Sequence, residues 1–212
     1  YYPGVSPHVN SIYSGFTVDG RKDFLPTNTI IDLMVSLGDP RLPLYFTQYE
    51  GAYVGAVAGL DAAQSYNNYS HFADRFFAAD FEAILIDYVE TEFLLAEAAQ
   101  RTWNVGSTTA EEYFDNAVTE SILYWEGTTG DANAYLLANP YDAANWKESI
   151  GTQKWLALYN RGVEGWAEWR RLDFPILNVP QAMVYGDIPS RMPYPFNEIK
   201  NNKVNYEAAS TA

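Results

Sequence analysis

Two glutamates in the stretch "GVEGWAEWRR", residues 162–171, are the carboxylates whose spacing could do chemistry. Glycoside hydrolysis needs two carboxyl groups that flank the scissile bond. Glu164 and Glu168 are four residues apart, so a helix places both on the same side of any ligand. Ion pairs with the following arginines or with Lys154 are therefore the favoured interpretation. A glycoside hydrolase or lyase that uses dispersed carboxylates stays as an alternative.

Trp166 and Trp169 of the same stretch face roughly one way, and Arg170 lies within cation–π reach of Trp166. A tryptophan stripe can be a ligand platform or the seam between two helices. Small residues beside these rings favour close packing against Trp155 of the preceding helix. We therefore expect both rings in the core, with the side chains of Arg170 and Arg171 bound to nearby loop carbonyls.

The candidate ligand-binding residues are tyrosines and asparagines on two loops. Flat rings pack against the C–H faces of sugars while amides bond to hydroxyl groups, and loops on a rigid scaffold often carry function. The regions around "TQYEGAYVG" and "SYNNYS" supply the candidates, which are Tyr45, Tyr49, Tyr53, Tyr66, Asn67, Asn68 and Tyr69. Each ring could instead cover the edge of the core, so both interpretations stay open.

Other catalytic and metal-binding sites find little support. The chain has no cysteine and only two histidines, His8 and His71, so zinc sites and Ser-His-Asp triads are disfavoured. It also lacks the glycine-rich motifs that bind nucleotides and the G-x-S-x-G elbow of hydrolases. Asp19 and Asp23 suggest calcium, but the Arg and Lys between them are unlike an EF-hand loop. We expect no cofactor, and calcium binding stays open.

Composition and charge limit the classes of partner that the chain is expected to bind. The 212 residues include 13 Lys and Arg against 27 Asp and Glu, which gives a net charge of −14. Such a chain repels a phosphate backbone, so nucleic acid is not expected as a partner. The 17 Tyr, 11 Phe and 6 Trp are too many to bury deeply, so some rings should meet sugars or proteins at the surface. No apolar run approaches the roughly 20 residues that span a bilayer.

Helical periodicity with long intervening loops predicts a mainly α fold in a single domain. The first part is loop-rich with one short helix, the second is helical, and the last is an irregular Pro-rich strap that wraps other elements and ends in one helical turn. The single domain is 1–212, and its three parts are 1–86, 87–174 and 175–212.

Local signals place the helix boundaries. Asn28 is the expected cap of the short helix and Gly38 its stop. Two later helices begin with Asp-x-x-Glu from Asp87 and Thr-x-x-Glu from Thr109. The short turn between them makes these two helices antiparallel. Prolines and glycines in residues 39–62 predict turns and short extended pieces instead of a helix.

Several ordered blocks resemble the SusD/RagB family, mainly its C-terminal half. They are "DPRLPLYF", "YVGAVAGLD", "YVETEFLLAEAAQR", "IGTQKWLALYNRGVEGWAEWRRLDFPIL" and "IPSRMPYPFNEIKNNKVNYEAA", and together they cover most of residues 28–209. The resemblance implies a SusD-like α-helical fold and a non-catalytic protein that binds glycans or other oligomeric nutrients. It also implies a place on the cell surface at the outer membrane, beside a SusC-like TonB-dependent transporter.

The resemblance further implies partners within the same protein. Family members carry a lipid-bearing cysteine and a tetratricopeptide-rich N-terminal half, and neither matches this sequence. We therefore expect a C-terminal portion, with the lipid anchor upstream and the missing N-terminal half as a partner. A purely structural partner of the transporter is a further alternative. The expected scaffold signature of the family is Trp155, Glu164, Trp166, Glu168, Trp169, Arg170 and Arg171.

Overall fold

The computed structural model describes residues 2–60, 64–182 and 188–210. Contacts divide the chain into a larger unit, Tyr1–Ala182, and a smaller unit, Met183–Ala212. The chain expected to form one domain is therefore divided into two units after Ala182. Residues 61–63 of the expected loop region and 183–187 of the strap lie outside the described residues.

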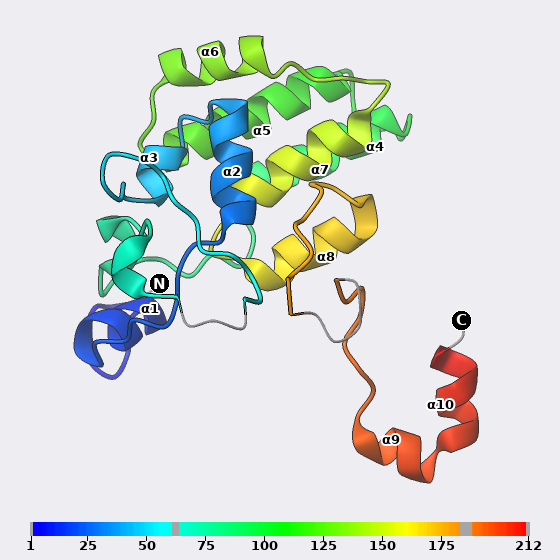
Figure 1. Cartoon of the computed structure of the whole chain (residues 1–212). Helices are drawn as coiled ribbons and strands as arrows, with labels where there is room; N and C mark the ends of the chain where they lie inside the picture. The colour runs from blue at the N-terminus through cyan, green and yellow to red at the C-terminus, as the bar shows by residue number, and fades with distance from the viewer. Residues whose placement is uncertain (1, 61–63, 183–187, 211–212) are drawn as a thin grey trace. The chain divides into compact units, whose positions relative to one another are not determined.

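The larger unit is built mainly from helices linked by long ordered loops (Figure 1). Its described residues form isolated β-bridges but no named strand, which confirms the mainly α fold. In the part of this unit that the structure describes, three short 3₁₀ or π turns are Ser14–Val18, Tyr66–Asn68 and Asp74–Phe77. The α-helices are α1 (Ser11–Tyr13), α2 (Asn28–Leu37), α3 (Leu42–Tyr45), α4 (Tyr88–Gln100), α5 (Ala110–Tyr124), α6 (Thr129–Ala138), α7 (Trp146–Ala157) and α8 (Gly162–Leu172).

Both predicted helix starts are confirmed at α4 and α5. The Asp87 side chain accepts a hydrogen bond from the Glu90 backbone N–H at 2.8 Å. Thr109 and Glu112 form a complete capping box in which each side chain bonds to the other's backbone N–H. These bonds satisfy N–H groups that have no partner within the helix.

The helices α4, α5 and α7 lie side by side, with α6 against α5 (Figure 1). Their facing sides meet in a buried hydrophobic cluster that includes Phe93 of α4, Phe114 and Ile122 of α5, and Ile150 of α7. Burial of such large side chains is the main stabilising term of the helical part. It gives the loops of the first part a rigid support.

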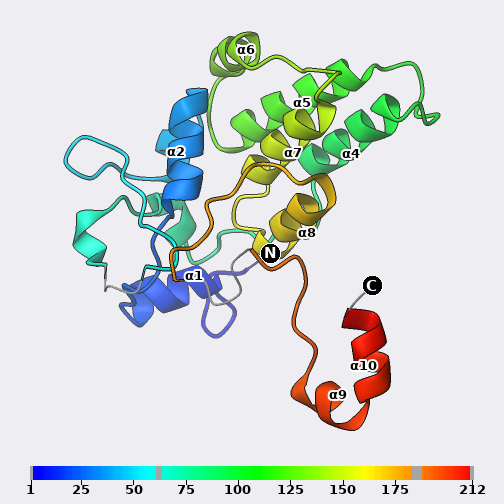
Figure 2. The same ribbon diagram turned by 45° about the vertical axis from the view of Figure 1, so that its right-hand side comes forward.

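A second core, rich in aromatic rings, joins the first part of the chain to these helices. The ring of Tyr45 in α3 stacks on Tyr159, with centroids 4.1 Å apart. Phe76 and Trp125 stack at 5.1 Å, and Ile31 of α2 is buried in the same cluster. Figure 2 shows α2 beside the layer of α4, α5 and α7. The loop-rich part is thus packed against the helical part.

A buried polar network also ties these parts together. The side chain of Arg41 is fully buried, and its Nε and Nη2 bond to the Asp39 carboxylate at 2.9 and 2.6 Å. Its remaining bonds reach Ser121 of α5 at 2.9 Å and Gln153 of α7 at 2.8 Å. The bonds to Asp39 close the turn between α2 and α3, and the bonds to Ser121 and Gln153 reach α5 and α7. The network therefore fixes the α2–α3 turn against these two helices.

The short helix and the segment after it differ from the sequence prediction. Thr27, in an extended conformation, is the cap of α2, and Asn28 is already helical. Gly38 ends the helix as predicted, with a φ of 61° that glycine adopts readily. Helix α3 lies within 39–62, where turns and extended pieces were expected, because packing of Tyr45 in the aromatic core favours one helical turn there.

The strap contains more helix than predicted. Its first residues belong to the larger unit, where the backbone N–H of Ala182 bonds to the carbonyl of Gly59 at 2.8 Å. Residues 188–210 of the smaller unit form two helices, α9 (Phe196–Asn201) and α10 (Lys203–Ser210), instead of one helical turn. Tyr194, two residues before α9, makes an edge-to-face contact with Tyr206 of α10 at 5.5 Å. Within the described ranges, no helix has the length and apolar character needed to cross a membrane.

Candidate functional site

Backbone hydrogen bonds bring the two predicted ligand loops together. The Thr47 N–H bonds to the His71 carbonyl at 2.8 Å. Val54 and Ser70 are joined twice, since each backbone N–H finds an acceptor on the other residue at 2.9 Å. Residues 47–54 and 66–71, which we call the tyrosine loops, therefore lie side by side.

The first tyrosine loop is a tight turn held against α2. Tyr49 and Ala52 exchange backbone hydrogen bonds, and Gly51 between them has a φ of 81°. At Gly55, just beyond the loop, a Cβ atom would lie 2.4 Å from the backbone N of Asn28. Only glycine permits this approach, so the start of α2 positions the loop.

The second tyrosine loop presents a stacked ring pair. The rings of Tyr66 and His71 are parallel within 15° at 3.9 Å, and His71 Nε2 lies 2.8 Å from the Tyr66 carbonyl. Tyr69 is half-buried like Tyr66, whereas Asn67 and Asn68 are exposed. Rings with one accessible side beside exposed amides can contact the C–H faces and hydroxyl groups of a sugar.

Tyr45 is the one candidate that the structure removes from the surface. Its ring is fully buried, and its hydroxyl donates to the Leu156 carbonyl at 3.0 Å. Tyr49 and Tyr53 are half-buried. Burial raises the pKa of Tyr53 and of Tyr66, so their hydroxyl groups stay protonated and able to donate. Tyr45 is thus a core residue, because α3 directs it inward.

The tryptophans of α8 are less buried than predicted. Gly165 and Leu172 are the buried residues of this helix, while Trp166 and Trp169 are half-buried and belong to neither hydrophobic cluster. Arg170 lies over the Trp166 ring at 4.5 Å, as predicted. Trp155 packs beside the aromatic core and next to Gly165. The helix turns its small residue inward, so the large rings lie on its flanks.

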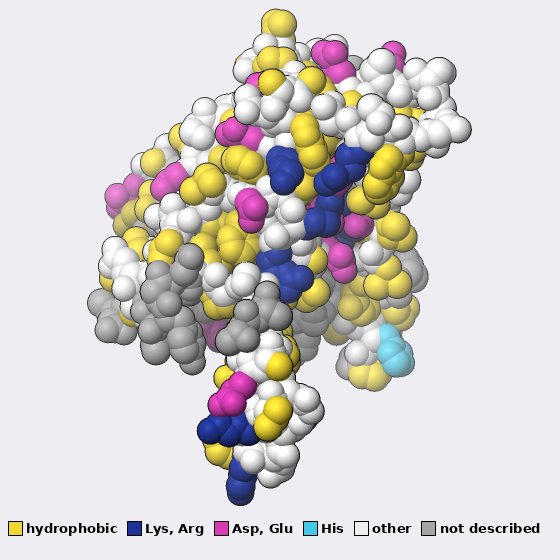
Figure 3. Space-filling view, turned by 90° about the vertical axis from the view of Figure 1, so that its right-hand side faces the viewer, with side chains coloured by type: hydrophobic (Ala, Val, Ile, Leu, Met, Phe, Trp, Pro, Cys, Tyr) yellow, Lys and Arg dark blue, Asp and Glu magenta, His cyan; other side chains and the backbone are white. Residues whose placement is uncertain are grey.

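Charged residues of α8 form ion pairs with α4 and α7. Glu168 pairs with Lys154 at 3.2 Å and with Arg171 at 2.6 Å, as predicted, while Glu164 is exposed. Arg171 also binds the Glu97 carboxylate at 2.6 Å, instead of the loop carbonyls expected for it. Figure 3 shows basic side chains gathered beside acidic ones on one face of the larger unit. These ion pairs hold α8 against α4 and α7, so they belong to the scaffold of the fold.

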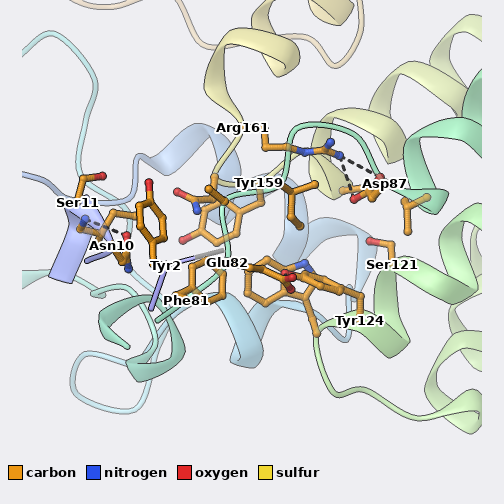
Figure 4. Close-up of a pocket in the computed structure, with 17 residues that line it drawn as sticks. Tyr2, Asn10, Ser11, Phe81, Glu82, Asp87, Ser121, Tyr124, Tyr159 and Arg161 are labelled. Atoms are coloured by element: carbon orange, nitrogen blue, oxygen red, sulfur yellow. Dashed lines mark hydrogen bonds and ion pairs between the residues drawn. The ribbon is translucent and has the colours of Figure 1, made fainter. Parts of the chain in front are cut away.

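A pocket of about 200 Å³ lies where the N-terminal segment, residues 81–89 and the ends of α5 and α7 meet (Figure 4). We call it the polar pocket. Its wall includes Tyr124, whose hydroxyl donates to Glu82 Oε1 at 2.7 Å. Burial, together with Glu82, raises the pKa of Tyr124. Arg161 pairs with Asp87 at 3.2 Å at another side of the pocket.

A larger apolar pocket adjoins the polar one. Its volume is about 400 Å³, and we call it the aromatic pocket because Phe16, Phe24, Phe72 and Phe76 line it. The two pockets share Ser11, Ile12, Tyr159 and Asn160. Neither pocket is predicted by the sequence, since their walls come from segments far apart in the chain and contain no local motif.

The described residues give no support for a metal-binding site. Among the residues that the structure describes, no three His, Asp or Glu side chains gather as metal ligands. The Asp23 carboxylate is bound by Arg21 at 2.5 and 3.0 Å. Arg21 would therefore compete with calcium for this carboxylate, which disfavours the calcium site suggested for Asp19 and Asp23.

The family follows from the sequence together with this fold. Residues 1–195 match the model of a SusD-like family described as "Starch-binding associating with outer membrane". The chain belongs to the SusD-like family. The SusD/RagB resemblance is thereby confirmed. No match is found among curated proteins.

Solved structures of SusD-like proteins share the fold. A chitin-binding protein is 26% identical with a TM-score of 0.76, over 94% of this chain and 49% of that one. A SusD homologue from Bacteroides vulgatus is 25% identical with a TM-score of 0.76, over 92% and 48%. One from Bacteroides ovatus, 24% identical, has a TM-score of 0.79 over 98% and 51%. The SusD-like chain spans about half the length of these structures.

Proposed function

We propose that this SusD-like protein binds a glycan without cleaving it, as a component of nutrient uptake at the outer membrane. The match of residues 1–195 to a family described as starch-binding carries the proposal. Similarity to a chitin-binding protein at 26% identity supports the same class of ligand. Both descriptions are those of binding proteins, which agrees with the expectation of a non-catalytic chain.

The tyrosine loops are the first surface that we propose for glycan contact. Tyr49, Tyr53, Tyr66 and Tyr69 offer partly exposed rings, and Asn67 and Asn68 offer exposed amides on the same pair of loops. Sugars bind in this way because their C–H faces pack on rings while their hydroxyl groups bond to polar neighbours. The hydrogen bonds between the loops hold these groups in place before a ligand arrives.

The glutamates of α8 do not favour hydrolysis. Glu168 is engaged by Lys154 and Arg171, and Glu164 lies on the same helix. A hydrolase needs its two carboxyl groups on opposite sides of the scissile bond. Binding without cleavage is therefore the function that this geometry supports.

The family description supports a location at the outer membrane, with a SusC-like TonB-dependent transporter as the proposed partner. Co-purification of the SusD-like protein with such a transporter from detergent-solubilised outer membranes would support this part. Recovery of the protein without the transporter under conditions that preserve other outer-membrane complexes would contradict it.

Calorimetric titration with chitin and malto-oligosaccharides tests glycan binding, and chromatography of the same mixtures tests cleavage. We expect binding without new products. A Tyr66→Ala, Tyr69→Ala double variant should bind at least tenfold more weakly, because stacking surface is lost at two rings. Trp103→Ala, which removes an exposed ring after α4, is the matched control and should bind normally. Failure of all these glycans to bind, or the release of products, would overturn the proposal.

A further inference from the structure

One hydroxyl group in the polar pocket lacks a hydrogen-bond partner. The Tyr159 oxygen is buried and has no partner among the residues that the structure describes. The ring itself is fixed, because it stacks on Tyr45 and meets Phe76 edge to face at 4.8 Å. Burial raises the pKa of Tyr159 well above its ordinary value, so the hydroxyl group keeps its proton. A rigid, protonated and unsatisfied donor is suited to an incoming acceptor.

The rest of the polar pocket resembles a site for a small hydroxylated ring. Figure 4 shows Tyr159 in the middle of the residues that line it. Phe81 and Trp125 provide buried apolar surface, whereas Glu82 and Asn160, which also line the pocket, are exposed. Buried rings and exposed polar groups in one pocket match the two kinds of surface on a sugar.

Volume limits what the polar pocket can hold. Its 200 Å³ is below the roughly 300–1,000 Å³ of pockets for drug-sized ligands, so one ring is the appropriate size. The charge of its wall is also mostly compensated, since Arg161 pairs with both Asp87 and Glu90. A neutral ring is therefore favoured over an anion.

The aromatic pocket provides space for a second ring of the ligand beside the polar pocket. It opens beside the same Tyr159 and Asn160, and Phe16 and Phe72 in its wall meet edge to face at 6.0 Å. Phe72 directly follows His71 of the second tyrosine loop. An extended ligand could therefore place successive rings in adjoining pockets without leaving the protein surface.

We propose that the polar pocket binds the terminal pyranose of an oligosaccharide, with the preceding residue over the aromatic pocket. The proposal rests on the glycan-binding function and adds a second subsite to the tyrosine loops. In the complex, a sugar oxygen accepts the hydrogen bond from Tyr159, and a sugar hydroxyl donates to the second carboxylate oxygen of Glu82.

Paired Tyr→Phe variants test the subsite in the intact chain. Tyr159→Phe removes an unpartnered hydroxyl group, so the melting temperature should not fall, while binding of chitin or malto-oligosaccharides should weaken roughly threefold to tenfold. Tyr45→Phe is the matched control, because Tyr45 stacks on the same ring but its hydroxyl already bonds to Leu156. It should lower the melting temperature and leave affinity unchanged.

The outcomes separate the subsite from the general function. Weaker binding by Tyr159→Phe and by Glu82→Gln, with a normal melting temperature, supports the subsite. Unchanged affinity in both variants, while the wild type binds and the Tyr66→Ala, Tyr69→Ala double variant binds at least tenfold more weakly, overturns the subsite and leaves the tyrosine loops as the glycan surface. Failure of the wild-type protein to bind any of these oligosaccharides overturns both proposals.

Discussion

Replacing Asp39 with Asn tests whether the buried Arg41 requires a negative partner. The Arg41 side chain is fully buried, and two of its nitrogens contact the Asp39 carboxylate at 2.6 and 2.9 Å. Asparagine keeps the shape of aspartate but removes the charge and converts one acceptor into a donor. Because the guanidinium group would stay buried without a counter-charge, we expect a loss of about 3–5 kcal/mol in the free energy of unfolding.

Differential scanning calorimetry measures that loss directly. In a protein of this size 1 kcal/mol corresponds to a shift of about 2–4 °C, so Asp39→Asn should lower the melting temperature by about 6–20 °C. Asp23→Asn is the matched control, since Asp23 also pairs with an arginine two residues away, but the side chains are 57% and 48% exposed. Exposed pairs contribute little, so the control should melt almost as the wild type does. Equal shifts in the two variants would refute the reasoning.

Two further predictions concern the loop support and the response to acid. Gly55→Ala should destabilise the larger unit by about 1–3 kcal/mol and weaken oligosaccharide binding, because its Cβ would meet the backbone of Asn28. Gly162→Ala is the control, since the space around its Cβ is open. Equal melting temperatures of the two variants would contradict the close approach at Gly55. Burial opposes ionisation of Glu97, but hydrogen bonds from Arg171 and Arg101 outweigh it and lower the pKa below its ordinary 4.5. Glu97 therefore contributes stability that is present above pH 4.5 and lost as the pH falls through the lowered pKa. Glu97→Gln should therefore flatten the dependence of the melting temperature on pH in that acidic range. A dependence equal to that of the wild type would contradict this role of Glu97.

Local sequence signals determined the helical part and the family. The caps at Asp87 and Thr109 act through bonds to residues three positions away, so their outcome depends little on the rest of the fold. The same holds for the Gly38 stop and for the Glu168–Arg171 pair within α8. Ordered blocks along the chain were also enough to indicate a SusD-like protein, which the family match confirms.

Tertiary packing decided which rings are accessible. Tyr45 and Tyr49 look alike as loop tyrosines, yet one is fully buried against Tyr159 and the other is half-buried on a turn. Trp166 was expected in the core and lies on a flank of α8, because Gly165 is the residue that faces inward. Residue type and spacing do not specify these outcomes, since burial depends on what the neighbouring elements place opposite each ring.

The polar pocket is also a product of the tertiary structure alone. Its walls come from Tyr2, the Phe81–Glu82 segment, Tyr124 and Tyr159, which are far apart in the chain and follow no spacing rule. The buried bonds of Arg41 arise in the same way, across 80 residues to Ser121 and 112 to Gln153. A sequence determines interactions within a turn or a helix through short-range geometry, whereas a pocket exists only after long-range packing has brought its separate walls together.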